Sequence, residues 1–256
     1  MKYGICPLTV VPLRAEPSDK SEMVSQLLFG EHYQVMLSQN NWLQIKCGYD
    51  EYEGWIAANQ HCETSLQIYN ELSASNSFLN FDLVQLLIKG KFMQTIVIGS
   101  TLPYFDGKNC YINQDKLTFE GNAKMPMQAE KSILVENAFM YLNSPYLWGG
   151  RSPLGIDCSG FTQMVYKLSG IRLKRDARLQ AEQGKTINLL AESNPGDLVF
   201  FDNEEGNIVH VGILINKENI IHSSGQVRVD KIDHHGIYDA EQKKYSHKLR
   251  VIKRLI

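Results

Sequence analysis

Residues 157–170 read Asp-Cys-Ser-Gly-Phe-Thr-Gln-Met-Val-Tyr-Lys-Leu-Ser-Gly, and this stretch decides the fold we predict for the C-terminal half. Asp157 is a favourable helix N-cap, because its carboxylate can accept hydrogen bonds from the free N–H groups of a first helical turn. Gly170 supplies a C-terminal glycine signal. We therefore predict a helix over residues 158–168, with Cys158 as its first residue.

Cys158 stands where a cysteine can act as a nucleophile. The partial positive charge at a helix N-terminus favours the thiolate, which is the nucleophilic form of the side chain. The carboxylate of Asp157 disfavours the thiolate, so a reactive Cys158 needs a cationic partner. The alternative is a small buried residue at a helix start. The chain has five cysteines, an odd number without a CxxC pair, so we predict neither a disulfide framework nor a structural zinc site.

Two histidines are candidate partners for Cys158. His210 lies in the apolar run 207–213, where a buried imidazole is costly without a hydrogen-bond partner. His222 follows twelve residues later, beyond a turn over residues 216–219, and a hairpin there brings the two histidines opposite each other or staggers them by a few residues. We interpret Cys158 as the nucleophile, His210 as general base and acid, and His222 as the group that orients His210. The alternative is a pair of structural histidines with satisfied hydrogen bonds.

The segments around these residues predict an α+β fold for the C-terminal half. Apolar residues at near-helical spacing predict another helix over residues 129–142. His234 and His235 are adjacent, so their side chains point opposite ways on an extended chain, and we predict a surface turn rather than a metal site. An antiparallel sheet follows the helices. Its predicted strands cover residues 198–201, 208–215, 220–223 and 249–256.

The N-terminal half is predicted to be mostly β-structure. Short strands and turns alternate up to residue 62, which is typical of a small barrel. A second all-β stretch runs from about residue 95 to residue 121. Between them, Asn80 is predicted to cap a helix over residues 81–89 that Gly90 ends. The apolar face of this helix would carry Leu83, Leu86 and Leu87.

The composition limits the classes of partner. The 256 residues are 43% hydrophobic and 21% charged, with 26 Lys and Arg against 28 Asp and Glu. A net charge of −2 gives no general attraction to nucleic acid or to anionic lipid. No stretch approaches the roughly 18 apolar residues of a membrane span, and nothing indicates an obligate protein partner. Residues 1–12 lack a signal-peptide pattern, so we expect a cytoplasmic protein, or a periplasmic one if a leader has been removed.

Four motifs in the C-terminal half resemble the NlpC-type papain-like cell-wall cysteine peptidases. They are Tyr-Leu-Trp-Gly-Gly at 146–150, Asp-Cys-Ser-Gly-Phe at 157–161, Pro-Gly-Asp-Leu-Val-Phe-Phe at 195–201 and His-Val-Gly-Ile at 210–213. The resemblance covers about residues 126–256. It implies a papain-like α+β fold without a cofactor. It also implies a triad of Cys158, His210 and His222, with Tyr146 stabilising the oxyanion beside the Cys158 N–H.

A narrower resemblance is to the subgroup that carries two bacterial SH3-like domains before the peptidase. It depends on motifs at residues 14–17, 21–31 and 52–56 and on Arg-Asp-Ala at 175–177. Members are γ-D-glutamyl-L-diamino acid endopeptidases, or dipeptidyl-peptidase VI, which cut L-Ala-γ-D-Glu from murein peptides with a free L-Ala amine. The resemblance implies SH3-like domains over residues 1–62 and 63–124, the second with a helical insertion, and a peptidase domain over residues 125–256.

The subgroup also implies a substrate pocket. Asp176 would bind the free amine, and the walls would be formed by Trp148, Ser159, Glu22 and Tyr52. Two departures bear on specificity: Lys174 replaces a usual proline, and Ala177 stands where some members have serine. Diaminopimelate and lysine remain open for the third position, as does the oligomeric state. The alternatives are an inactive murein-peptide-binding protein and a related amidase or acyltransferase.

Overall fold

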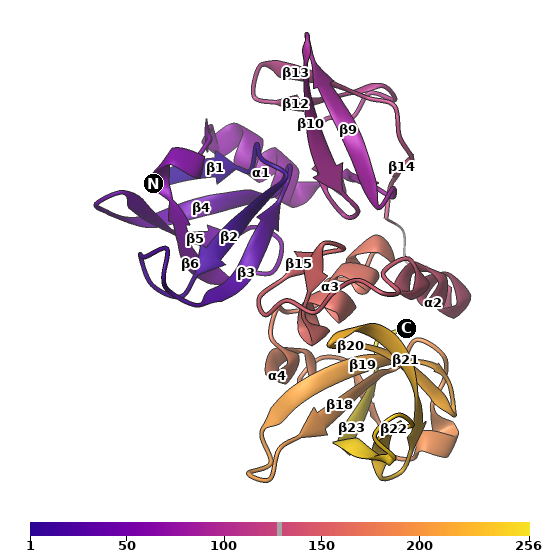
Figure 1. Cartoon of the computed structure of the whole chain (residues 1–256). Coiled ribbons are helices and arrows are strands. Elements are labelled where there is room, and N and C mark those ends of the chain that lie inside the picture. Colours follow the sequence, from indigo (N-terminus) through magenta and orange to yellow (C-terminus); the bar gives the residue numbers. More distant parts are fainter. Residues whose placement is uncertain (127–129) are drawn as a thin grey trace. The chain divides into compact units, whose positions relative to one another are not determined.

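The computed structural model describes residues 1–126 and 130–256, which form two compact units (Figure 1). The first unit comprises Met1–Pro126 together with Trp148–Pro153. The second comprises Met127–Leu147 and Leu154–Ile256. The short segment 148–153 therefore packs with the N-terminal unit although its neighbours in sequence belong to the other unit, which the sequence did not predict.

The first unit begins with a seven-stranded antiparallel sheet in the order β3-β2-β6-β5-β4-β1-β7. Buried and partly exposed residues alternate along β2 and β5, so one face of each strand enters a common core. This core includes Leu13, Leu27, Tyr33, Ile45 and Ile56. The small all-β structure predicted for the first 62 residues is confirmed. Its strands are β1 (Lys2–Ile5), β2 (Val10–Arg14), β3 (Met23–Leu28), β4 (His32–Gln39), β5 (Trp42–Cys47), β6 (Glu53–Ala57) and β7 (Glu63–Thr64).

The rest of the first unit packs on this sheet through a shared core. Ile5 and Phe29 lie in one apolar cluster with Leu87, Leu102 and Phe119. Two further sheets have the orders β10-β9-β13-β12 and β11-β8-β14. The elements are η1 (Ala58–Gln60), α1 (Leu66–Ala74), β8 (Phe78–Asn80), β9 (Val84–Lys89), β10 (Phe92–Val97), β11 (Thr101–Leu102), β12 (Asn109–Ile112), β13 (Asp115–Phe119), β14 (Ala123–Lys124) and β15 (Arg151–Ser152).

The prediction of a helix over residues 81–89 is wrong. Asn80 does not cap a helix: its Oδ1 accepts the backbone N–H of Asp82 at 3.0 Å, which makes an Asx turn. The chain then forms β9, which pairs antiparallel with β10, with Leu87 facing Gln94. Gly90 has a φ of 61° and serves the turn between the two strands rather than a helix C-terminus. The helix within residues 63–124 is instead α1, which precedes strands β8 to β14.

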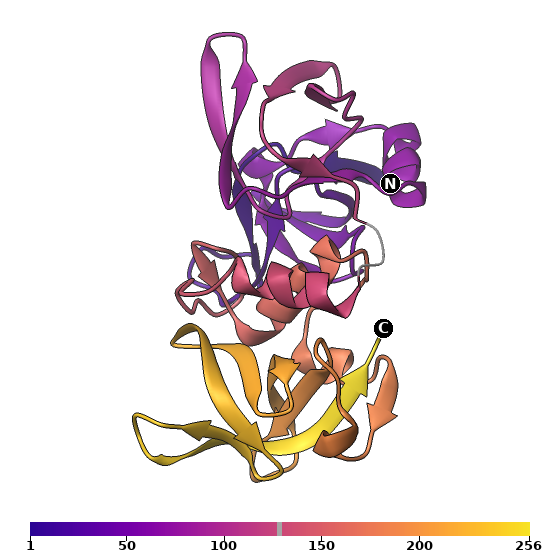
Figure 2. The ribbon, with the colours of Figure 1, turned by 90° about the vertical axis from the view of Figure 1, so that its right-hand side faces the viewer.

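The second unit places helices before a seven-stranded antiparallel sheet in the order β17-β23-β18-β19-β20-β21-β22 (Figure 2). An additional β22–β23 pairing connects strands near its two ends. The predicted α+β arrangement is confirmed. The helices are α2 (Lys131–Phe139), α3 (Cys158–Leu168), α4 (Ala177–Gln180) and η2 (Leu190–Glu192). The strands are β16 (Gly155–Ile156), β17 (Lys185–Ile187), β18 (Leu198–Asp202), β19 (Ile208–Asn216), β20 (Asn219–Ser224), β21 (Gln226–Asp233), β22 (Gly236–Asp239) and β23 (Lys244–Arg254).

The helix α3 is the centre of the second unit. It covers residues 158–168 as predicted, and every one of its residues is buried. It packs against α2 and against β19 and β20. The helix predicted over residues 129–142 is observed as α2, and Ala129 lies outside the described residues. Burial on all sides gives α3 a fixed place, so its first residue, Cys158, is held at a defined point beside the sheet.

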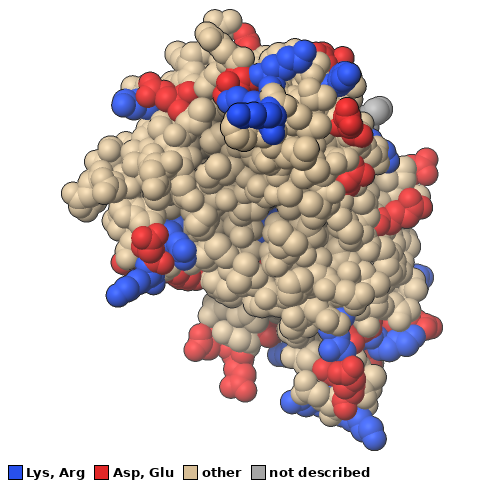
Figure 3. Space-filling model, turned by 45° about the horizontal axis from the view of Figure 1, so that its top comes forward, with Lys and Arg blue, Asp and Glu red and all other residues tan. Residues whose placement is uncertain are grey.

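The surface carries both signs of charge. In the view of Figure 3, Lys and Arg side chains lie close to Asp and Glu side chains instead of gathering into one basic patch. This pattern agrees with the near balance of acidic and basic residues in the sequence. Among the described residues, no helix is both long and apolar enough to cross a membrane.

Candidate active site

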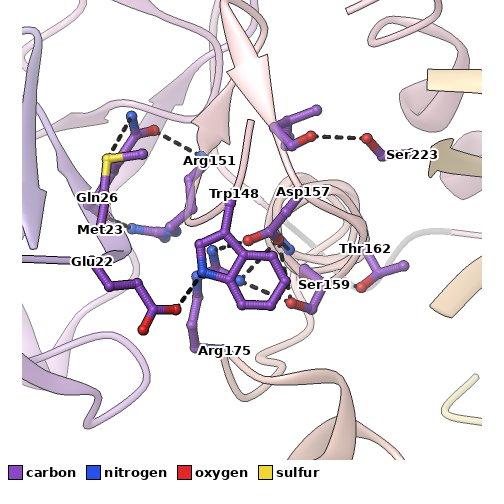
Figure 4. A network of polar contacts seen from close by, with 12 residues as sticks. Glu22, Met23, Gln26, Trp148, Arg151, Asp157, Ser159, Thr162, Arg175 and Ser223 are labelled. Carbon is purple, nitrogen blue, oxygen red and sulfur yellow. Dashed lines mark hydrogen bonds and ion pairs between the residues drawn. The ribbon is translucent and has the colours of Figure 1, made fainter. Parts of the chain in front are cut away.

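Cys158 lies at the start of α3, and a buried ion pair supports this start. Asp157 caps the helix by accepting the backbone N–H of Gly160 at 2.6 Å. Arg175 donates to both carboxylate oxygens of Asp157, at 3.0 and 2.6 Å (Figure 4). Arg175 is only 2% exposed, so a surface position for this side chain is ruled out. A guanidinium suits this place because its planar fork matches a carboxylate.

The surroundings of Cys158 favour the neutral thiol over the thiolate. Burial, and then the charge of Asp157, raise its pKa to about 12, against the smaller opposing effects of the Val211 and Ser159 backbone and of Arg175. The position at a helix N-terminus favours a thiolate. At Cys158, burial and the charge of Asp157 outweigh this effect. A thiolate must form by proton transfer to a base during the reaction. The influence of the Val211 backbone shows that the thiol lies beside β19, the strand on which His210 directly precedes Val211.

His210 and His222 meet as the hairpin predicts. The β19–β20 register pairs His222 with Gly212, so the histidines are staggered by two residues and lie on the same face. Nε2 of His210 and Nδ1 of His222 are 2.8 Å apart and share a hydrogen bond. Burial, and then His222 and His247, lower the pKa of His210 well below its usual value. His210 is therefore a neutral imidazole at rest, which can accept the proton of Cys158.

A carboxylate extends the pair of histidines. Oδ2 of Asp230 lies 2.9 Å from Nε2 of His222, and Arg228 holds the same carboxylate at 2.8 Å. Burial opposes the ionisation of Asp230, but the hydrogen bonds with His222 and Arg228 outweigh it and lower its pKa. Sequence reasoning missed both residues. The next hairpin contained the signal, since the β20–β21 register pairs His222 with Arg228 and Ile220 with Asp230.

Tyr146 lines a cavity together with His210. Its backbone N–H donates to the carbonyl of Gly225 at 2.9 Å, which fixes the residue against the start of β21. Burial, and then the charges of Cys158 and Asp157, raise the pKa of Tyr146 to about 12. The phenol therefore keeps its proton and can donate a hydrogen bond. The cavity has a volume of about 260 Å³ and is lined by Tyr146, Val209, His210, Ser223, Ser224, Gly225 and His247.

Two predicted substrate-binding residues belong to the second unit. Asp176 is the half-buried N-cap residue of α4 and makes no side-chain capping bond. The hydroxyl of Ser159 accepts from Arg175 at 2.9 Å and lies 3.3 Å from Asp157 Oδ1. Ser159 thus contributes to the buried polar network below Cys158. Its role as a pocket wall, like the role of Asp176, stays a prediction.

The other three predicted residues belong to the first unit. Trp148 donates its indole N–H to Oε1 of Glu22 at 2.5 Å, so two of the three are in contact (Figure 4). Tyr52 is half-buried and packs partly against the core of the first sheet. The structure therefore brings Trp148 and Glu22 together. The substrate-binding roles of all three stay predictions.

A second buried ion pair holds the segment that carries Trp148. Arg151 forks onto both oxygens of Glu31, at 2.8 and 2.9 Å, and donates to the carbonyl of Gln26 at 2.6 Å. Its backbone N–H donates to the side chain of Gln26 at 2.7 Å. Gly149 has a φ of 76°, and a Cβ there would lie only 2.2 Å from the Met23 carbonyl oxygen. These contacts explain why the segment belongs to the first unit.

Within the described ranges 1–126 and 130–256, no group of three or more His, Cys, Asp or Glu side chains is arranged to hold a metal ion. The arrangement instead joins a thiol, a neutral imidazole, a second imidazole and a carboxylate. This order is suited to nucleophilic catalysis in which a base activates a thiol and is itself oriented by a third group.

Comparisons with known proteins agree with this chemistry. A model of the NlpC/P60 family matches residues 143–248, and a model of the bacterial dipeptidyl-peptidase SH3 domain matches residues 13–60. Dipeptidyl-peptidase 6 of Lysinibacillus sphaericus is 28% identical over 260 residues, which cover 88% of this chain and 90% of that protein. γ-D-Glutamyl-L-lysine dipeptidyl-peptidase of Bacillus subtilis (strain 168) is 30% identical over 216 residues, which cover 78% of this chain and 71% of that protein.

A solved structure extends the likeness to the whole fold. The crystal structure of an NlpC/P60 family protein from Bacillus cereus superposes with a TM-score of 0.80 at 20% sequence identity, covering 98% of this chain and 99% of that one. An SH3 domain and a papain-like peptidase domain are thus present, as the motifs indicated. The chain belongs to the NlpC/P60 family of cysteine peptidases.

Proposed function

We propose that this peptidase hydrolyses the bond between the γ-carboxyl of D-Glu and the amine of a diamino acid in murein peptides with a free N-terminal L-Ala. The product is the dipeptide L-Ala-γ-D-Glu, and the role is murein recycling on soluble peptides in the cytoplasm. The relay of His210, His222 and Asp230 beside Cys158 is the observation that carries the reaction type. The substrate class is supported by relatives named dipeptidyl-peptidase 6 and γ-D-glutamyl-L-lysine dipeptidyl-peptidase.

The reaction begins with proton transfer from Cys158 to His210. The sulfur attacks the γ-carbonyl carbon of D-Glu, and a C–S bond forms while the carbonyl oxygen becomes an oxyanion. The Cys158 N–H belongs to the first turn of α3, where no carbonyl of the helix can accept it. This N–H and the protonated phenol of Tyr146 donate to the oxyanion. These donors favour the charge that exists only along the reaction path, so they lower the barrier to acylation.

The second half of the reaction returns the enzyme to its resting state. The His210 imidazolium gives its proton to the leaving amine, and the C–N bond breaks to leave a thioester on Cys158. His210 then takes a proton from water, whose oxygen bonds to the thioester carbon. The C–S bond breaks, the dipeptide leaves with a new carboxyl group, and His210 returns the proton to the sulfur of Cys158. Throughout, the hydrogen bond to His222 fixes the His210 ring, and Asp230 fixes His222 in turn.

The same proposal assigns recognition of the free amine to Asp176. A carboxylate suits an ammonium group because such a charge-assisted bond contributes about 1.5–3 kcal/mol. Ser159, Trp148, Glu22 and Tyr52 are proposed as further substrate-binding residues, as the family resemblance implies. Residues 63–124 are proposed to be a second SH3-like domain, since they form short antiparallel strands after α1.

Cleavage of defined tripeptides tests the proposal. L-Ala-γ-D-Glu-diaminopimelate and L-Ala-γ-D-Glu-L-Lys would be incubated with the enzyme, each with a free or an acetylated amine, and the products read by mass spectrometry. We expect release of the dipeptide from the free peptides and a roughly 10- to 100-fold lower kcat/KM for the acetylated ones. Equal turnover of free and acetylated peptides would exclude recognition of the amine. Cys158→Ala should abolish cleavage, whereas Cys62→Ala, which changes another free cysteine, should not.

A further inference from the structure

His247 is a histidine of the second unit to which the reaction as proposed assigns no role. It lies on β23 and is half-buried at the edge of the cavity that His210 and Tyr146 line. Its ring is stacked on the ring of His210, with centroids 4.0 Å apart and planes 25° apart. Nδ1 of His247 lies 2.9 Å from the hydroxyl of Ser246, which limits the rotation of the ring.

Three aromatic rings, each from a different strand, surround the ring of His210. Phe201 on β18 is the direct cross-strand partner of His210, and their ring centroids are 5.7 Å apart. The ring of His222 lies 5.0 Å from that of His210 and 5.8 Å from that of His247. His247 lies on β23, which pairs with β18. Leu249, two residues after His247, is the cross-strand partner of Phe201. All four rings therefore lie on one face of the sheet.

The stack supplies a constraint that the hydrogen bond to His222 lacks. That bond fixes one edge of the His210 ring, but a single hydrogen bond leaves the ring free to tilt about it. A second ring lying against the face of His210 limits this tilt. A general base must hold its ring nitrogen within a few tenths of an ångström of its working position, because small misplacements cost large factors in rate.

We propose that His247 is a positioning residue for His210, and that its stacked ring holds the imidazole in the plane in which it reaches both His222 and Cys158. This inference rests on His210 acting as the base of the proposed reaction. It assigns no contact with the substrate to His247. Its consequence is that the shape of the ring at position 247, rather than its charge, determines the rate near neutral pH.

The charges around the stack support a neutral ring. Burial, and then His222, lower the pKa of His247 to about 4, while Asp230 acts in the opposite direction. Of the described groups, His210, His222 and Asp230 are those that exchange electrostatic effects within this cluster, and Arg228 reaches it through Asp230. Two protons on neighbouring rings repel each other, so His247 competes with His210 for a proton only in acid.

Three variants separate ring shape from other effects. His247→Phe keeps a ring that can stack, whereas His247→Leu and His247→Asn remove it. Tyr245→Leu is the matched control, because Tyr245 lies on the same strand and contacts the rings of Tyr238 and His235 rather than that of His210. Each variant would be tested for the alkylation rate of Cys158 by iodoacetamide, for kcat and KM on the free tripeptide, and for the ¹⁵N shifts of the His210 ring.

We expect His247→Leu and His247→Asn to lower kcat roughly 10- to 100-fold with KM nearly unchanged, and to lower alkylation of Cys158 in parallel. His247→Phe should stay within about threefold of the wild type at neutral pH, and Tyr245→Leu should match the wild type. In His247→Phe the acidic limb of kcat/KM should move to higher pH, because the competing proton acceptor is gone. The ¹⁵N chemical shifts of the His210 ring should change in His247→Leu and His247→Asn and stay at their wild-type values in His247→Phe.

Two outcomes would overturn the inference. Wild-type kcat and alkylation in His247→Asn or His247→Leu would show that the stack is dispensable. A Phe variant as slow as the Leu variant would show that the imidazole, and not its ring shape, is needed. Alkylation and the NMR signals need no substrate, so they test the inference even if the wild type fails to cut the tripeptides. That failure would contradict the proposed function alone.

Discussion

The two units each bury an arginine that forks onto a carboxylate, and the two pairs differ in what they hold. In the second unit, Arg175 binds Asp157, which caps the helix that begins with Cys158. In the first unit, Arg151 binds Glu31 and holds the segment 148–153. One pair secures the start of a helix, and the other secures a short excursion of the chain. The same kind of ion pair thus supports a helix start beside the candidate nucleophile in one unit and the placement of a chain segment in the other.

The comparison also concerns energy. Burying two charges is costly, and breaking such a pair leaves one charge without a partner, which typically destabilises a protein by 3–5 kcal/mol. Both pairs are 7% exposed or less. We therefore expect similar losses of stability when either arginine is removed. The losses of activity should differ, because only Arg175 lies in the network around the nucleophile.

The largest effect is expected for Arg175→Met. It leaves the Asp157 carboxylate buried beside Cys158, so the unfolding free energy should fall by about 3–5 kcal/mol. It also removes a positive charge that lowers the pKa of Cys158, so kcat/KM should fall at least 100-fold. Urea unfolding and tripeptide cleavage measure the two quantities. Arg178→Met is the control, since its pair with Glu182 is exposed, and a similar loss there would contradict the argument.

Arg151→Met is expected to cost a similar amount of stability with a smaller loss of activity. The carboxylate of Glu31 stays buried and loses its guanidinium partner, so the cost should again be about 3–5 kcal/mol. The fall in kcat/KM should be about tenfold. The double variant Glu31→Leu, Arg151→Met should recover most of the stability, because neither charge of the pair is left without the other. Equal losses of activity in Arg151→Met and Arg175→Met would contradict the different roles assigned to the two pairs.

A third pair, between Arg228 and Asp230, should give an intermediate effect. Asp230→Asn weakens the bonds to His222 and Arg228, so we expect a loss of about 1–2 kcal/mol and roughly tenfold in kcat. The lowered pKa of Asp230 means that its contribution is present above its unfolded value and is lost as pH falls through the folded value. Stability of the wild type should therefore fall more steeply than that of the variant as the pH drops below about 4. Parallel curves would show that Asp230 is not the titrating group.

The smallest effect is expected for a pair at the surface. Lys89 and Asp115 are 2.5 Å apart, but their side chains are 53% and 56% exposed. Solvent screens such a pair, so Lys89→Met should change the unfolding free energy by less than about 1 kcal/mol and leave kcat/KM unchanged. A loss as large as that of Arg151→Met would show that distance, rather than burial, determines the strength of these pairs.

Local sequence patterns determined the elements that carry the chemistry. The N-cap Asp157 and the stop at Gly170 predicted α3, because both signals act within a few residues of the helix ends. The turn between β19 and β20 predicted that His210 and His222 would meet, since a two-strand hairpin fixes its own register. The first sheet was predicted from strands that alternate with turns. The structure finds all three where the sequence placed them.

Other features were decided only by tertiary structure. The leucines of residues 81–89 fit a helical face, yet pairing with β10 makes this segment a strand, because non-local hydrogen bonds and burial outweigh a weak local preference. His247 enters the site from β23, a strand whose neighbours in the sheet are set by the closure of the whole unit. The burial of Arg151 and Arg175 depends on partners far away in the chain. A single sequence determines which residues can cap, stack or pair, but the packing of distant segments decides which of them do so, because burial and strand register are properties of the folded chain.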